Sequence, residues 1–151
     1  MGNILNIKDL EEIKERVADL KRDDLPLWGK MNVGEMLCHT ADQVKMATGE
    51  IITKDKSTFN SRFFLKKLIL LGVPAPKGKI ETLPEINPQM LGSKPVNFES
   101  DRDYLLRKIT EFISFEESKL CPHPTFGKLT KKQWGRFIYL HVDHHLSQFG
   151  S

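Results

Sequence analysis

The stretch Leu129–Gly150, LTKKQWGRFIYLHVDHHLSQFG, predicts the last helix of the protein and carries three of its five histidines. A capping box marks its start. The side chain of Thr130 can accept a hydrogen bond from the backbone N–H of Gln133, and the side chain of Gln133 can accept one from the backbone N–H of Thr130. His141 and His145 stand four residues apart. On an α-helix this spacing places them about 40° apart around the axis and about 6 Å apart along it. Two imidazoles so placed can bind one divalent ion from a single helix face.

The apolar face of this predicted helix includes both histidines. At about 100° per residue, five side chains lie within about 60° of His141: Trp134, Phe137, Ile138, His145 and Gln148. An inward imidazole needs a partner, because a buried polar group without a hydrogen bond costs about 1–3 kcal/mol. The pair is therefore either two core histidines bonded to protein acceptors or two ligands of a metal ion. The spacing alone does not choose between them.

Two neighbours of the pair have different predicted roles. His144 lies about 60° to the other side of His141, so an H-x-x-H pair is also geometrically allowed. Exposure at the helix edge, or a hydrogen bond to a ligand, is the predicted role of His144. Asp143 points nearly opposite to His141 and is excluded as a ligand or catalytic base. The segment HVDHH lacks the glutamate of H-E-x-x-H, so a zincin-type protease is not indicated.

Further helices are predicted upstream, where apolar side chains recur at spacings of three and four. They cover Ile7–Lys21, Asn32–Gly49, residues 57–71 and a segment that begins near Ser100. No segment has a convincing strand pattern. The chain is therefore predicted to be an all-α, four-helix bundle with an extra short helix. Its 151 residues suit a single domain over residues 1–151.

Short-range signals predict where these helices begin and end. Asp23-Asp24-Leu25-Pro26 is expected to end the first helix, because the residue before a proline is pushed out of the α region. Asn32 and Glu35 resemble a second capping box. Ser100 and Asp103 offer a cap and negative charge for the first turn of the later helix.

The predicted helices over Asn32–Gly49 and residues 57–71 carry a histidine and a broad apolar face, respectively. On the predicted helix Asn32–Gly49, His39 lies at the edge of the apolar stripe, a position that predicts a side chain lining a cleft rather than one buried in packing. The helix over residues 57–71 has a broad apolar face that is expected to cover the bundle or to form a dimer contact. That face consists of Phe59, Phe63, Phe64, Leu68 and Leu71.

The segment from Val73 to Phe98 contains five of the eight prolines, a density that excludes a helix. A loop of this length is either a binding segment or a connector. We predict that it forms a partly ordered wall of a pocket. Its length also leaves room for a crossover connection between the second and third helices of the bundle.

Composition excludes several classes of protein. The formal net charge is +3 without a block of like charges, so no nucleic-acid partner is predicted. No secretory signal is apparent, and the most apolar stretch, Phe63 to Val73, is too short to span a membrane. Cys38 and Cys121 do not make a disulfide framework. A cytoplasmic protein with no membrane partner is expected.

Two motifs carry a resemblance to a known family. Pro26–His39 has the pattern P-x-W-G-K-M-N-x-x-x-M-L-x-H, and His123–Gly150 supplies the second motif, HPTFGKLTKKQWGRFIYLHVDHHLSQFG. Together they resemble an uncharacterised bacterial family of the DinB-like (YfiT-like) superfamily of metalloenzymes. The resemblance implies a four-helix bundle with a crossover connection. It also implies a metal site of His39, His141 and His145 with one coordination position open, for which zinc and nickel are both suitable.

The resemblance also suggests a reaction, because relatives in the superfamily include S-transferases and an isomerase that use low-molecular-weight thiols. The leading hypothesis is a metal-dependent S-transferase that activates a small-molecule thiol toward an electrophile. The alternatives are a metal-dependent hydrolase and a non-catalytic metal-containing bundle that acts in binding or dimer assembly. Relatives often form homodimers. No catalytic residue is assigned; polar candidates near the site are Asn32, Glu35, Gln43, His144 and Gln148.

Overall fold

The computed structural model describes residues 1–73 and 82–151, and over these ranges it is helical apart from turns, loops and one isolated bridge between His123 and Gly127. The all-α class predicted from the sequence is confirmed. The helices are α1 (Ile7–Asp19), α2 (Val33–Thr48), α3 (Lys66–Leu70), α4 (Phe98–Ser114) and α5 (Lys131–Gln148). Three short turns accompany them: η1 (Ser61–Leu65), η2 (Pro84–Ile86) and η3 (Glu117–Lys119).

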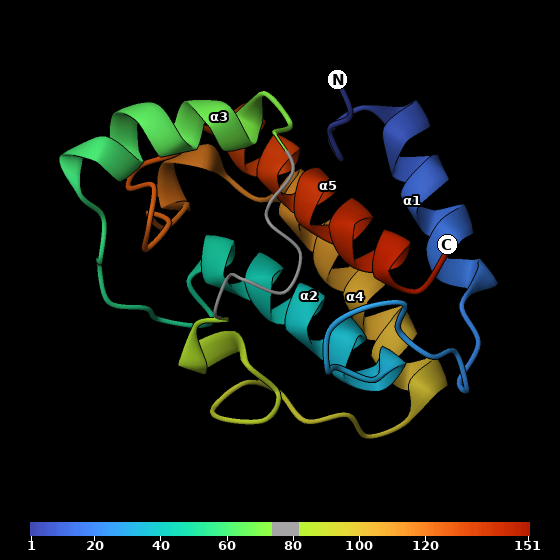
Figure 1. Ribbon diagram of the computed structural model, residues 1–151. Coiled ribbons are helices and arrows are strands. Elements are labelled where there is room, and N and C mark those ends of the chain that lie inside the picture. Colours follow the sequence, from blue (N-terminus) through green and yellow to red (C-terminus); the bar gives the residue numbers. More distant parts are fainter. Residues whose placement is uncertain (74–81) are drawn as a thin grey trace.

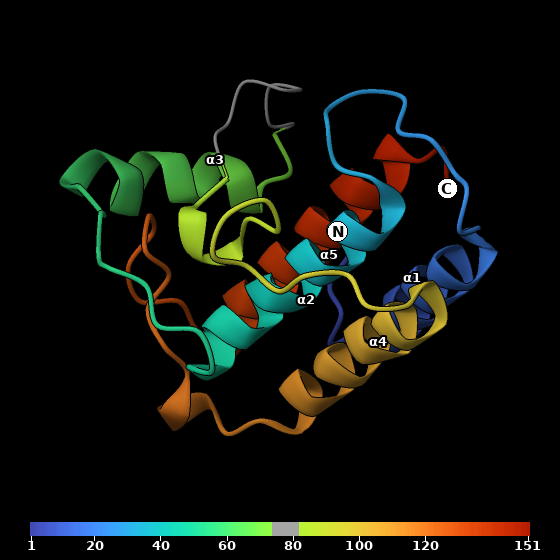
Figure 2. The ribbon, with the colours of Figure 1, turned by 90° about the horizontal axis from the view of Figure 1, so that it is seen from below.

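The four longer helices pack around one core. α2 lies against α4 and α5, and α1 lies against the same two helices (Figures 1 and 2). The α1–α2 and α4–α5 links therefore do not join the helices that pack together most extensively. Side chains predicted on the apolar stripes form the buried cluster, among them Leu10, Ile13, Val17, Leu105, Ile109, Phe112, Trp134 and Ile138.

Both capping boxes are present. The backbone N–H of Glu35 donates to Asn32 Oδ1 at 2.9 Å, and that of Asn32 donates to Glu35 Oε2 at 3.0 Å. Thr130 and Gln133 make the same reciprocal pair at the start of α5. α2 ends where Gly49 adopts φ 82°, a left-handed conformation that glycine reaches without strain.

Three helix ends differ by two residues from their predicted positions. α1 stops at Asp19 rather than Lys21, well before Pro26, and the Asp24 carboxylate then accepts the backbone N–H of Lys21 at 2.8 Å in the following turn. α4 begins at Phe98 rather than Ser100, because Asn97 and not Ser100 is its cap. α5 ends at Gln148, two residues before the predicted end at Gly150.

The helix predicted over residues 57–71 differs most from expectation. Residues 59–70 are helical, but Ser61–Leu65 form a π-helical turn that interrupts the α-helix, and α3 covers only Lys66–Leu70. Its apolar face is not buried: Phe63 and Phe64 are 58% and 64% exposed. The opposite side faces α5 and the turn before it. There Ser61 Oγ donates to the Thr125 carbonyl at 2.6 Å, and Arg136 Nε donates to the Leu70 carbonyl at 3.1 Å.

The described part of the proline-rich segment, residues 82–97, is held against α2. Its anchor is the fully buried Asp42, which accepts hydrogen bonds from the Ser93 backbone at 2.7 Å, Ser93 Oγ at 2.6 Å and Lys45 Nζ at 2.8 Å. The segment contains one short 3₁₀ turn, η2, with Pro84 at a first-turn position that tolerates proline. Pro74 and Pro76 lie outside the described residues.

Candidate metal centre

α2 places His39 in the interior. This helix is covered by α4, α5 and η2, and most of its residues are buried. His39 is only 3% exposed, so the prediction that it lines a cleft at the edge of an apolar stripe was wrong. The prediction used only the apolar stripe on one side of α2. In the structure α4, α5 and η2 cover other sides of this helix as well.

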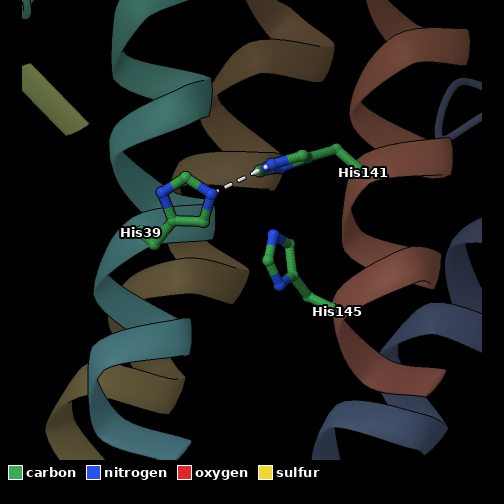
Figure 3. Close-up of side chains that lie close together, drawn as sticks. All are labelled: His39, His141 and His145. Carbon is green, nitrogen blue, oxygen red and sulfur yellow. Dashed lines mark hydrogen bonds between the residues drawn. The ribbon is translucent and has the colours of Figure 1, made fainter. Parts of the chain in front are cut away.

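α5 brings His141 and His145 to the same place, on the side that faces α2. The three imidazole rings form a nearly equilateral triangle (Figure 3), with ring-centre distances of 4.8 Å from His39 to His141, 4.8 Å from His39 to His145 and 4.7 Å between His141 and His145. One nitrogen of each ring lies within 4.8 Å of the others. His141 and His145 are half-buried, so the group is not sealed from solvent.

A backbone acceptor determines the tautomer of His39. Its Nδ1 lies 2.8 Å from the carbonyl oxygen of Ile86 in η2. A carbonyl can only accept, so Nδ1 carries the hydrogen. Nε2 therefore holds a lone pair, and it points toward the other two rings (Figure 3). An acceptor behind a histidine in this way is the usual outer partner of a metal ligand.

The tautomer of His145 follows from a longer chain of contacts. The side-chain nitrogen of Gln148 donates to the Trp28 carbonyl, which fixes the orientation of the Gln148 amide. Its oxygen, Oε1, consequently faces His145 Nδ1 at 2.9 Å and accepts its hydrogen. His145 Nε2 is left with a lone pair on the side of the ring that faces His39 and His141 (Figure 3).

The contact between His39 and His141 fits a shared cation. Their Nε2 atoms are 3.1 Å apart, whereas two nitrogens bound tetrahedrally to one zinc ion at its usual bond length are about 3.4 Å apart. Because His39 Nε2 has no hydrogen, either His141 Nε2 donates one to it or a cation lies between them. His141 Nδ1 is buried without a hydrogen-bond partner in the described structure, so no acceptor behind the ring orients His141 in the way that Ile86 O and Gln148 Oε1 orient the other two rings.

All three rings are neutral at physiological pH. Burial lowers the pKa of His39 below its usual value, although the hydrogen bond to Ile86 acts in the other direction. Burial and the neighbouring histidines lower the pKa of His141 well below 6.5, and burial lowers that of His145 to about 3. Neutral imidazole is the form that binds metal ions. Within residues 1–73 and 82–151, these three are therefore a group able to hold a divalent ion.

The comparisons with known proteins place the chain in one family. A family model described as a protein of unknown function, DUF1569, matches residues 2–151. The chain belongs to the DUF1569 family. The prediction of an uncharacterised family is thereby confirmed. No curated protein and no solved structure matches. Among the described residues of this DUF1569 member, no helix has the length and apolar character needed to cross a membrane.

Other candidates from the sequence lie outside the histidine group of this DUF1569 protein. Asp143 pairs with Arg16 at 2.6 Å, in agreement with its exclusion as a ligand. Cys38 is a buried core residue whose pKa is raised to about 12, chiefly by burial, so it is not a thiolate. Asn32 and Glu35 are committed to the capping box of α2. His144 packs edge-on against Trp28, with ring centres 6.1 Å apart.

His123, which stands between two prolines, has a structural role. It is buried, and its Nδ1 accepts the backbone N–H groups of Thr125 and Phe126 at 3.1 and 3.3 Å. Its ring stacks on Phe126 and meets Phe137 edge-on, and Phe137 in turn stacks on His141. His123 thus supports the wall behind His141 and is not part of the ligand group.

One functional atom could not have been found from the sequence: the Ile86 carbonyl that orients His39. It belongs to a backbone, and its approach to α2 depends on the fold of the 82–97 segment. Gln148 was a polar candidate on the face of His141, and its contact with His145 gives it a defined role. Two surface cavities, of about 290 and 470 Å³, have no histidine among their lining residues.

Proposed function

We propose that the protein is a metal-dependent enzyme whose ion is held by the Nε2 atoms of His39, His141 and His145. The observation that carries the proposal is the orientation of two of these rings by acceptors behind them, Ile86 O and Gln148 Oε1. Buried histidines with a purely structural role have no need to converge with lone pairs facing one another. Zinc and nickel both suit three imidazole ligands.

An open coordination position supports catalysis over a structural role. Structural zinc sites have four protein ligands, whereas catalytic sites have three and leave one position for water or substrate. In the described part of the chain, no further histidine, cysteine or carboxylate joins the three histidines as a candidate ligand. His141 and His145 are also only partly buried, as an exchangeable ligand at this position requires.

We propose a thiol-dependent S-transferase as the reaction class, on the strength of the resemblance to the DinB-like superfamily. When bound, a divalent ion supplies charge that stabilises a thiolate, the nucleophilic form of a small-molecule thiol. The three neutral histidines add no charge of their own to the site. We also propose the DinB-like arrangement for the bundle and the cytoplasm as its compartment.

Elemental analysis followed by a thiol titration tests the proposed function. The purified protein is expected to contain one zinc or nickel ion per chain. After substitution with cobalt, addition of a low-molecular-weight thiol is expected to produce a thiolate-to-cobalt charge-transfer band. A fully loaded protein whose spectrum does not respond to thiols would exclude the transferase. Ester or amide hydrolysis by that protein would then favour the hydrolase, and inactivity toward both substrate classes would favour a non-catalytic bundle.

A homodimer remains our proposal for the assembly, supported by the exposed apolar side of α3 and η1. Phe64→Ser is expected to weaken self-association, measured by sedimentation at several concentrations. It should change the free energy of unfolding by less than about 0.5 kcal/mol, because the ring is exposed in the monomer. Leu91→Ser is the matched control, since Leu91 is 76% exposed on a different segment. Equal behaviour of the two variants would argue against this face.

A further inference from the structure

Gln148 lies between the histidine group and the segment that precedes α2. Its side chain is 4% exposed and uses both ends: Oε1 accepts from His145 Nδ1 at 2.9 Å, and Nε2 donates to the Trp28 carbonyl. These two bonds depend on each other. If the Trp28 carbonyl moved away, the Gln148 amide could rotate and turn its NH₂ group toward the N–H of His145 Nδ1. Two donors would then face each other, and the hydrogen bond would be lost.

The backbone of Gln148 holds the same segment. Its carbonyl accepts the N–H of Leu27 at 2.7 Å, so Gln148 bonds to backbone groups of two consecutive residues, Leu27 and Trp28. Apolar burial contributes little to holding this part of the chain, since the Leu25 and Leu27 side chains are 81% and 70% exposed. The ring of Trp28 lies beside His144, at the edge of the candidate metal centre.

Gly29 shows how closely the segment approaches Gln148. Its φ is +85°, and a Cβ at this position would lie 2.3 Å from Gln148 Nε2. A side chain at residue 29 would therefore be strained by its own backbone and would also displace the Gln148 amide. The contact requires glycine for both reasons.

From these contacts we propose that Gln148 couples the ion site to the segment Leu27–Gly29. The hydrogen bond that directs His145 Nε2 toward an ion and the position of this segment against Gln148 stabilise each other. The inference rests on the proposed ion site. An ion selects the tautomer of His145 with hydrogen on Nδ1, that tautomer needs Gln148 Oε1, and Gln148 is oriented by Trp28. Such coupling is reciprocal, so, while the Gln148 amide links the two, whatever loosens the segment also weakens ion binding. Gln148 is in this sense a positioning residue.

The test measures zinc affinity, by competition with a chromogenic chelator, and hydrogen exchange of the Leu27 amide with and without zinc. Zinc is expected to slow exchange at Leu27 in the wild type. Gly29→Ala and Gln148→Met should each lower zinc affinity about 10- to 100-fold, the usual range for the outer partners of metal ligands. In both variants, zinc should no longer protect the Leu27 amide.

Two further variants separate coupling from loss of structure. Gln148→Glu keeps an acceptor for His145 but places a carboxylate against the Trp28 carbonyl. Zinc affinity should therefore be kept within a few-fold, while protection at Leu27 is lost. Gly49→Ala is the matched control, because Gly49 has a similar φ of +82° but its nearest neighbour is Cys121. It should lower stability and leave zinc affinity unchanged.

Each outcome decides a different point. Wild-type zinc affinity in both Gly29→Ala and Gln148→Met would overturn the coupling and leave the ion site standing. An equal loss of affinity in Gly49→Ala would also overturn it, because the effect would then be one of general stability. A wild-type protein that binds no zinc or nickel would overturn the proposed function itself.

Discussion

Replacing His141 with alanine is expected to lower the affinity for zinc or nickel by more than about a hundredfold. Outer partners of metal ligands are commonly worth 10- to 100-fold in affinity, and His141 is one of only three proposed direct ligands. Its Nε2 atom also lies 3.1 Å from that of His39, so its removal opens the group on the α5 side. Competition with a chelator of known affinity measures the loss.

His144→Ala is the control for this prediction. His144 is adjacent to His145 in sequence, and its ring centre lies 5.2 Å from that of His145, but it is not a member of the convergent group. Its removal should change ion affinity by no more than a few-fold. If His144→Ala lost the ion and His141→Ala kept it, the ligand set proposed for α5 would be wrong.

Acidification is expected to destabilise the ion-free protein strongly below about pH 6.5. Burial lowers the pKa of His123 and of His145 from 6.5 to about 3, so between these values the unfolded chain binds protons that the folded protein does not. Stability is therefore full above pH 6.5 and declines as the pH falls toward 3. Each such histidine contributes about 1.4 kcal/mol per pH unit within that window. His39 and His141 act in the same direction.

Urea unfolding at pH 7, 6 and 5 with a chelator present measures this effect. His123 and His145 together should reduce the free energy of unfolding by roughly 4 kcal/mol between pH 7 and 5, a large part of the stability of a typical domain. Saturating zinc should oppose the loss, since an ion at 100 times its dissociation constant adds about 2.7 kcal/mol. A free energy of unfolding that stays constant between pH 7 and 5 would contradict the burial of neutral histidines.

The sequence by itself determined the local features of this protein. The capping boxes at Asn32 and Thr130 depend on bonds between residues three apart, and the apolar stripes depend on helical periodicity. The shared face of His141 and His145 also follows from one helix alone. These features were predictable because every interaction involved lies within a few residues along the chain.

Only the tertiary structure decided which of these features meet. His39 reaches the pair because α2 packs on α5, and its tautomer depends on a carbonyl 47 residues away in η2. Gln148 acquires its role from Trp28, 120 residues distant in the chain. The sequence left open whether the apolar side of the helix over residues 57–71 covers the bundle or forms a dimer contact, and in the structure this side, on α3 and η1, faces outward. Periodicity predicts that a helix has an apolar side. Whether another element covers that side depends on how the other helices are arranged.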